Sequence, residues 1–372
     1  MAPADVPTSA SRGRAPANVP TSASRGRAPA DVPTSASRGQ ARRGTAVRAG
    51  SPAKAPLSLA GIATYPLARR PAKVSLADAA RPHRRGASLG GFLESLPRVL
   101  AAQTLLALRD EILRARDRGR PVIWGLGAHV LKVGLSPVLV DLMERGLVTA
   151  IALNGAGVVH DFELAVVGRT SEDVEKGLGS GAFGMARETG EEVNRAIVEG
   201  DRDGLGLGAA VGRHLALRRP RPPHLDASLL AAAWRLGLRA TVHVAIGTDV
   251  VHLHPACDPA AVGRATHLDF RLFAAEVARL GKGGVYLNVG SAVVLPEVFL
   301  KAVTLARNLG HRLSDFTTAN LDFLQSYRPG TNVVERPVKG SGRGYRLTGH
   351  HEIVVPLLAA ALVERAGPRR RR

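Results

Sequence analysis

Ile151-Ala-Leu-Asn-Gly-Ala-Gly-Val-Val-His-Asp-Phe-Glu163 is the stretch of this sequence that decides the fold. Its apolar beginning predicts a buried strand that ends at Asn154, and the apolar residues after His160 predict a helix. Gly155 and Gly157 lie between the two elements. A strand, a glycine turn and a helix in this order present backbone N–H groups and a helix N-terminus to an anion. The alternative interpretation is an ordinary tight turn followed by a solvated histidine.

The same order of elements recurs on both sides of this stretch. Strands are predicted near 122–127, 147–154, 241–246, 285–289 and 313–318, and helices near 92–116, 136–146, 191–218, 226–237, 267–280, 296–307 and 353–364. Alternating strands and helices predict an α/β fold with a Rossmann-like, doubly wound and mostly parallel sheet that has helices on both faces. Residues 169–190 are polar and glycine-rich, which indicates a long loop or lid.

The N-terminal part differs in composition from the rest of the chain. A 13-residue unit starts at Ala2 and returns at Ala15 and Ala28 with few changes. Each copy has two prolines and almost no large apolar residue, so it cannot bury enough surface to fold. We therefore predict a disordered Arg/Ala/Pro-rich tail over residues 1–85 and a folded α/β domain over residues 90–368.

Charge and cysteine content indicate the cellular compartment of the protein and its classes of binding partner. Residues 1–88 hold 15 Lys and Arg against three Asp, so most of the net charge of +20 lies there. Such a tail can attract nucleic acid or anionic lipid, but we interpret it as solvated disorder and not as a specific nucleic-acid site. The single Cys257 fits a reducing compartment. Since no apolar run approaches the roughly 18 residues of a membrane span and no secretory signal is seen, we expect a cytoplasmic protein without a membrane partner.

Polar and ionisable residues follow four of the predicted strands. The strand ends are residues 125–127, 154–157, 247–249 and 290–291, and the side chains at or behind them are His129, His160, Asp161, Asp249, His252, His254 and Glu297. Right-handed crossovers bring the carboxyl ends of parallel strands to one edge, where ligands bind. No Gly-x-Gly-x-x-Gly follows the first strand, so a dinucleotide would be bound in another way.

Four of the residues after position 250 are close enough in sequence to suggest a metal site: His252, His254, Cys257 and Asp258. Residues 250–254 alternate like an extended strand, which would place both histidines on one face. A second group of ligands with suitable spacing is not found elsewhere in the sequence. We therefore predict no metal and interpret the histidines as hydrogen-bonded residues of a pocket.

Five short segments carry a resemblance to a known family. They are Gly127-Ala-His-Val130, Asn154-Gly-Ala-Gly-Val-Val-His-Asp161, Ile246-Gly-Thr-Asp249, Gly290-Ser-Ala-Val-Val-Leu-Pro-Glu297 and Val354-Val-Pro-Leu-Leu358. Each resembles a motif of the deoxyhypusine synthases, and their order along residues 124–364 is the order in that family. The resemblance implies a Rossmann-like homotetramer with NAD near subunit interfaces. It also implies transfer of an aminobutyl group from spermidine, through an imine, to a lysine of a partner protein.

The resemblance also implies roles for individual residues. Cofactor contacts are expected from Gly127, His129, Asn154, Gly155, Gly157, Asp161, Thr248 and Gly290. Contacts with the polyamine are expected from Asp249, His252 and His254, and catalytic roles from Lys339, Glu297 and His160.

The positions that correspond to the family's catalytic residues differ from the family pattern. The family's catalytic lysine follows Trp-Gly, whereas the aligned position here is about Pro337, and Lys339 replaces that lysine only if the loop is shifted. Glu297 stands where the family has a catalytic histidine, and His160 where it has a glutamate. Glu297 can equally be an ordinary acid in the first turn of a helix, where the helix dipole favours it.

Three functions remain open from the sequence. The first is an NAD-dependent transferase of deoxyhypusine-synthase type that acts on spermidine or a related polyamine. The second is an NAD-dependent oxidoreductase or lyase on the same scaffold without a covalent lysine. The third is a non-catalytic nucleotide-binding or polyamine-binding protein, which the many ionisable residues at the strand ends disfavour.

Overall fold

The computed structural model describes residues 56–366 in two units, which divide between Arg70 and Pro71. The 13-residue repeat lies outside the described residues. In the first unit, residues 56–70 are exposed and contain one 3-10 turn, η1 (Leu67–Arg69). Residues 71–85 of the second unit are also largely exposed and contain η2 (Leu76–Asp78). The predicted disorder of residues 1–85 stays a prediction.

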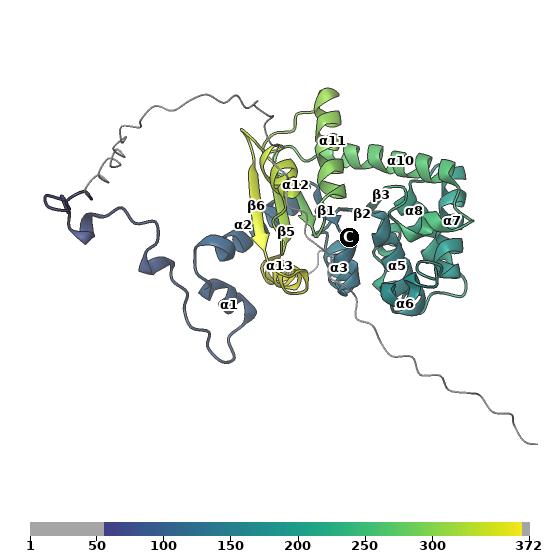
Figure 1. The fold of residues 1–372 in the computed structure, drawn as a ribbon, viewed down its shortest axis with the longest axis horizontal. Coiled ribbons are helices and arrows are strands. Elements are labelled where there is room, and N and C mark those ends of the chain that lie inside the picture. Colours follow the sequence, from purple (N-terminus) through teal and green to yellow (C-terminus); the bar gives the residue numbers. More distant parts are fainter. Residues whose placement is uncertain (1–55, 367–372) are drawn as a thin grey trace, which may run out of the picture. The chain divides into compact units, whose positions relative to one another are not determined.

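The second unit contains a parallel sheet of six strands (Figure 1). They are β1 (Val122–Leu126), β2 (Ala150–Asn154), β3 (Arg239–His243), β4 (Val285–Val289), β5 (Thr317–Asp322) and β6 (Arg343–Thr348). Their order across the sheet is β3-β2-β1-β4-β5-β6, and all five neighbouring pairs are parallel. This order is that of the doubly wound Rossmann fold, with its switch point between β1 and β4. The predicted fold class is therefore confirmed.

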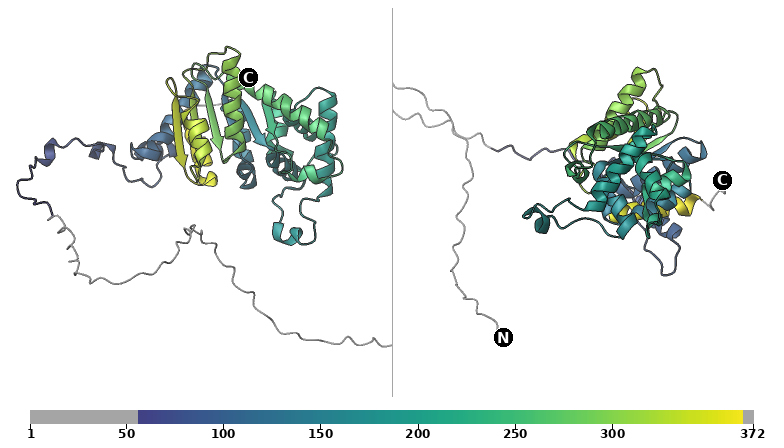
Figure 2. Two further views of the ribbon diagram at one scale, coloured as in Figure 1. Left: turned by 45° about the horizontal axis from the view of Figure 1, so that its top comes forward. Right: turned by 90° about the vertical axis from the view of Figure 1, so that its right-hand side faces the viewer.

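Helices connect the strands and cover both faces of the sheet (Figure 2). They are α1 (Leu89–Ser95), α2 (Leu100–Asp117), α3 (Ala128–Lys132), α4 (Ser136–Glu144), α5 (Gly155–Val167), α6 (Val174–Leu178), α7 (Arg187–Arg202), α8 (Leu207–Leu217), α9 (Leu229–Leu236), α10 (Pro259–Ala278), α11 (Val294–Asn308), α12 (Tyr327–Pro329) and α13 (His351–Ala366). Shorter turns are η3 (Leu225–Ala227), η4 (Val250–Leu253) and the π-helical η5 (Gly330–Glu335). Within residues 56–366, no helix is long and apolar enough to cross a membrane.

Alternate residues of the central strands pack into two separate cores. Ile123 and Tyr286 contact the core formed with α10, α11 and η5. Trp124 and Leu287 contact the other core, to which α2, α4, α5, α8, α9 and α13 contribute. All residues of β1 and β4 are buried, as expected for central parallel strands that are covered on both faces.

Some predicted boundaries were wrong, each for a local reason. The strand predicted at 241–246 ends at His243, and Ile246 beyond it is 68% exposed. The strand predicted at 313–318 begins at Thr317, because Leu313 and Phe316 are buried in the loop before it. Residues 250–254, predicted as extended, contain the 3-10 turn η4 (Val250–Leu253) instead. Residues 169–190 contain α6 and the start of α7. β6 was not predicted because this edge strand is exposed and polar at most positions.

A close approach between β1 and β4 depends on a glycine. A Cβ atom on Gly125 would overlap the hydroxyl of Tyr286. The Tyr286 ring is stacked on Phe299 with centroids 3.8 Å apart, so it cannot turn aside easily. The buried Tyr286 hydroxyl has no hydrogen-bond partner within the described residues.

We expect Gly125→Ala to destabilise the protein by about 1–3 kcal/mol, because a methyl group is forced into a filled core. Tyr286→Phe alone should be nearly neutral, since it removes an unpartnered buried hydroxyl. The double variant should recover most of the loss, because the hydroxyl is the overlapping atom. Urea unfolding of the four proteins measures this coupling, and strictly additive losses would contradict it.

Candidate functional site

The carboxyl ends of β2 and β3 border a cavity of about 250 Å³. His160, Thr248 and Asp249, all predicted from the sequence, line it together. The other lining residues are Lys132, Ala156, Val159, Glu163, Ser171, Glu172, Val174, Phe183, Gly184, Ala186, Thr189 and Val250. An apolar wall with a few converging polar groups is typical of a site for a small molecule.

His160 lies on α5 and is oriented by a chain of hydrogen bonds. Its Nδ1 is 2.7 Å from Thr170 Oγ1, and the Thr170 hydroxyl donates to Glu163 Oε2 at 2.5 Å. Thr189 donates to the other oxygen of Glu163 at 3.1 Å. Because Thr170 gives its only proton to Glu163, the Nδ1 of His160 must be the donor to Thr170. A neutral His160 then has no proton on Nε2, which is the form of a general base.

The surroundings of His160 also favour its neutral form. Burial lowers the pKa of this imidazole, and the positive charges of Lys132 and His129 lower it further. The ring is therefore neutral at pH 7 and becomes charged only when it takes up a proton. Lys132 lines the same cavity, whereas His129 does not.

Asp249 brings a carboxylate to the start of α5. The residue is 5% exposed, and a Cβ atom on Gly155 would overlap its Oδ2. Burial raises the pKa of the Asp249 carboxyl, while the charge of His252 and hydrogen bonds from Ala156 N–H and Thr248 oppose that rise. Oδ2 is buried without a hydrogen-bond partner among the described residues. A cation beside the Asp249 carboxylate would favour its ionised form.

The glycine turn after β2 does not leave an open cradle for an anion. Asn154 Oδ1 accepts a hydrogen bond from Gly157 N–H at 3.0 Å, so Asn154 is the N-cap of α5. The Asp249 carboxylate lies in the space that the missing side chain of Gly155 leaves. The N-terminus of α5 is therefore capped by groups of the protein itself, which corrects the expected anion site.

The ends of β1 and β4 meet in a similar way at the switch point of the sheet. Gly127 N–H donates to Val289 O at 2.8 Å, and a Cβ atom on Gly127 would overlap the carbonyl of Gly290. Gly290 has φ +68° and lies against the ring of His351. The rings of His129 and His351 meet edge to face with centroids 5.6 Å apart.

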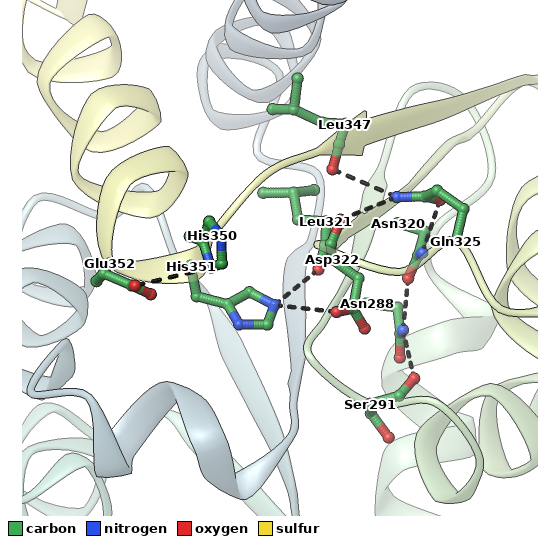
Figure 3. Close-up of polar contacts among 10 residues, drawn as sticks. All are labelled: Asn288, Ser291, Asn320, Leu321, Asp322, Gln325, Leu347, His350, His351 and Glu352. Carbon is green, nitrogen blue, oxygen red and sulfur yellow. Dashed lines mark hydrogen bonds and ion pairs between the residues drawn. The ribbon is translucent and has the colours of Figure 1, made fainter.

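A buried polar network lies beside this point, at the ends of β4, β5 and β6 (Figure 3). Asn288 donates to Asn320 at 2.8 Å, and Asn320 donates to Gln325 at 2.9 Å. Gln325 in turn donates to the carbonyls of Asp322 and Leu347 at 3.2 and 3.4 Å. The network ties the three strand ends together.

His351 joins the same region from the start of α13 (Figure 3). Its Nε2 lies 3.2 Å from Leu321 O and 3.7 Å from the Asp322 carboxylate. Since a carbonyl only accepts, Nε2 carries a proton, and Nδ1 is left buried without a partner within the described residues.

The residues of these turns do not fit a dinucleotide within one chain. The space beside Gly155 holds Asp249, and the space beside Gly127 holds the Gly290 carbonyl, so neither turn admits a pyrophosphate. The cavity of about 250 Å³ is also smaller than the usual site for a drug-sized ligand.

Two predicted site residues have structural contacts instead. Asp161 is fully buried and accepts hydrogen bonds from the Ser228 hydroxyl at 2.6 Å and from the N–H groups of Leu229 and Leu230 at 2.7 and 3.2 Å. It therefore holds the N-terminus of α9 and faces away from the cavity, although burial raises its pKa to about 6.

Glu297 lies in the first turn of α11 and forms ion pairs on the surface. Its partners are Lys301 and Arg328, and Asn332 donates to it at 2.9 Å. Hydrogen bonding by Lys301 lowers the pKa of Glu297 most. This arrangement agrees with the interpretation of Glu297 as an ordinary acid near a helix start.

The remaining predicted residues are not brought to the cavity. His252 accepts from Gly247 N–H at 3.3 Å, and His254 accepts from Ala256 N–H at 3.2 Å; neither lines the cavity. Lys339 is exposed in the segment before β6, at the amino edge of the sheet and thus opposite the cavity. Within residues 56–366, no group of three or more His, Cys, Asp or Glu side chains is placed to hold a metal ion.

Sequence reasoning missed four residues of the site: Lys132, Glu163, Thr170 and Thr189. Glu163 carried a usable signal, because positions three apart on a helix lie on the same face and His160 precedes it by three. Thr170 and Thr189 gave no signal, since they reach Glu163 from the segment between two helices and from the start of α7.

No family model matches this sequence, and no curated protein matches it. Among solved structures, the arginine dihydrolase ArgZ from cyanobacteria is similar at 15% identity and a TM-score of 0.44, covering 72% of this chain and 33% of ArgZ. AgrE, solved with ornithine and NAD+, is 16% identical with a TM-score of 0.45, and the match covers 70% of this chain and 32% of AgrE. A candidate deoxyhypusine synthase from Entamoeba histolytica is 10% identical with a TM-score of 0.46, and the match covers 76% of this chain and 95% of that protein. The chain thus spans about a third of ArgZ and AgrE, and none of these similarities assigns an activity.

We expect His160 to titrate below its ordinary pKa of 6.5, because burial and the charge of Lys132 both disfavour imidazolium. Lys132→Gln should raise the pKa of His160, since it removes a positive neighbour. Lys176→Gln, which removes a lysine paired with Asp173 outside the cavity, should not. NMR titration of the ring, assigned with His160→Gln, measures the values, and a pKa at or above 6.5 would contradict this account.

Proposed function

We propose that this chain is an enzyme that binds a small organic amine in the cavity at the ends of β2 and β3, where His160 accepts a proton. The observation that carries this proposal is the placement of an oriented, neutral His160 and of Asp249 in the lining of one cavity. Three carboxylates and one lysine line the cavity, which favours a cationic ligand.

The inferred chemistry begins with the ammonium form of the amine, which predominates at neutral pH. Asp249 supplies a charged acceptor for the ammonium group, and the apolar side chains of Val159, Val174 and Phe183 contact its carbon chain. Nε2 of His160 then removes a proton and leaves a free amine with its lone pair. Either transfer or oxidation of the amine requires that form.

Glu163 stabilises the charged state of His160 once the proton has moved. The imidazolium donates from Nδ1 to Thr170, and Thr170 donates to the Glu163 carboxylate. The carboxylate thus acts through one hydroxyl group and not in direct contact with the ring. Such an arrangement resembles the orienting acid of a catalytic triad in its role, with a threonine inserted between acid and base.

The finer form of the proposal rests on the sequence resemblance alone. In that form the amine is spermidine or a related polyamine, and an aminobutyl group passes through an imine to a lysine of a partner protein. NAD is the oxidant, and its site lies near interfaces of a cytoplasmic homotetramer. The order of the five motifs supports this version.

The second candidate is an oxidoreductase or lyase that acts on the amine without a covalent lysine. The position of Lys339 at the amino edge of the sheet favours it, since no shift of one loop brings that residue across the sheet. Lys132 is the lysine that lines the cavity, so a transferase would have to use it.

We expect spermidine to bind the full chain and Asp249→Asn to weaken that binding at least about tenfold, because a charge-assisted contact in a buried site is lost. Glu175→Gln is the matched control, since Glu175 is a nearby exposed acid that does not line the cavity. Isothermal titration calorimetry at pH 7 gives the affinities. Equal affinities for the two variants would show that spermidine is attracted by surface charge only and would remove support for the site.

Reductive trapping separates the two candidates. The protein is incubated with NAD, spermidine and cyanoborohydride and then mapped by mass spectrometry. If the transferase is correct, we expect a butylamine-sized adduct on Lys132 and none in Lys132→Gln. Unmodified lysines together with NADH absorbance near about 340 nm would instead support the lysine-free oxidoreductase.

A further inference from the structure

A second cavity, of about 860 Å³, lies at the opposite edge of the sheet, where β4, β5 and β6 begin. Its walls come from the C-terminal part of α2 and from the three loops that enter these strands. The volume falls within the range of small-molecule sites. Neither the sequence motifs nor the proposed function accounts for it.

The cavity carries an excess of positive charge. Arg114, Arg118, Lys282 and Arg343 line it together with two carboxylates, Glu111 and Asp315. Glu111 is buried and forms ion pairs with Arg114 at 2.7 Å and with Arg343. Within the part of the chain that the structure describes, Arg118 and Lys282 form no ion pair. These two cations are therefore available to a ligand.

Backbone hydrogen bonds connect the loops before β4, β5 and β6, which together form the floor of the cavity. Lys282 N–H donates to Ser314 O at 2.9 Å, Gly283 N–H to Asp315 O at 2.6 Å, and Asp315 N–H to Ser341 O at 2.5 Å. Lys282 and Asp315 have φ of +67° and +56°, a region that non-glycine residues rarely adopt. Such conformations cluster at ligand sites, where neighbouring contacts hold them in place.

Arg118 lies directly over this floor. Its Nη1 is 3.3 Å from the position that a Cβ atom on Gly283 would occupy, so a larger residue there would crowd the guanidinium. Arg118 comes from the end of α2 and Lys282 from the loop before β4. The two cations thus approach the same cavity from different elements.

We propose that this cavity binds a small phosphorylated molecule. The planar guanidinium of Arg118 suits two phosphate oxygens, and Lys282 adds a point charge. Ser341 and the glycines beside it offer a hydroxyl and accessible backbone. A nucleic acid fits less well, because Phe316, the aromatic residue of the lining, is buried and offers no face for stacking.

The test is calorimetric titration of the full chain with inorganic pyrophosphate. We expect Arg118→Gln and Lys282→Asn each to weaken binding on the order of tenfold, since each removes a charged contact. Asparagine tolerates the left-handed backbone at position 282, so the loop is retained. The matched control is Arg312→Gln, which removes an exposed cation near the cavity that does not line it. All variants keep the same basic N-terminal sequence.

Thermal unfolding gives a second readout that does not depend on activity. Pyrophosphate should raise the midpoint temperature of unfolding of the wild type and of Arg312→Gln, but not that of the Arg118→Gln/Lys282→Asn double variant. A ligand stabilises the folded state only if that state binds it. The melting curve without ligand shows whether the double variant is folded. Equal binding by all variants, or preferential binding of a single-stranded oligonucleotide that is insensitive to Arg118→Gln, would overturn the proposal.

Discussion

The pairing of β1 with β4 is the interaction on which the rest of this structure depends. It joins residues far apart in the sequence, aligns Leu126 with Val289, and sets the point where the winding of the chain reverses. The two strands approach closely because Gly125 leaves room for Tyr286 and Gly127 leaves room for the Gly290 carbonyl. Every other strand adds outward from this pair, so the carboxyl ends of all six strands share one edge. The position of the candidate site at the ends of β2 and β3 follows from that alignment.

The fold could be predicted from local patterns because the central strands β1, β2 and β4 are short, mostly apolar and followed by glycine. Val285–Val289 was predicted with its observed boundaries, since burial on both faces requires a continuous apolar run. β6 could not be found in that way, because an exposed edge strand such as Arg343–Thr348 has no apolar pattern. Its existence depends on the backbone of β5, which offers free hydrogen-bonding groups to whatever segment lies beside it.

The candidate site was predicted only in part, because side chains distant in sequence occupy its spaces. The turn at Gly155 has the local pattern of an anion site, but Asp249 fills it from the loop after β3. Asp161 follows His160 directly, yet it faces the opposite way and holds the start of α9. A helix turns by 100° per residue, so neighbouring residues point in different directions. His160 and Asp249 were therefore found, whereas their hydrogen-bonding and electrostatic partners required the structure.

Thr170, which lies between Glu163 and His160, connects the hydrogen bonding of the His160 imidazole to the wall of the cavity. Thr170 belongs to the segment that also supplies Ser171 and Glu172 to the cavity wall. The orientation of the imidazole is therefore coupled to the position of residues 170–172, because any displacement of this segment would break the hydrogen bond between Thr170 and His160.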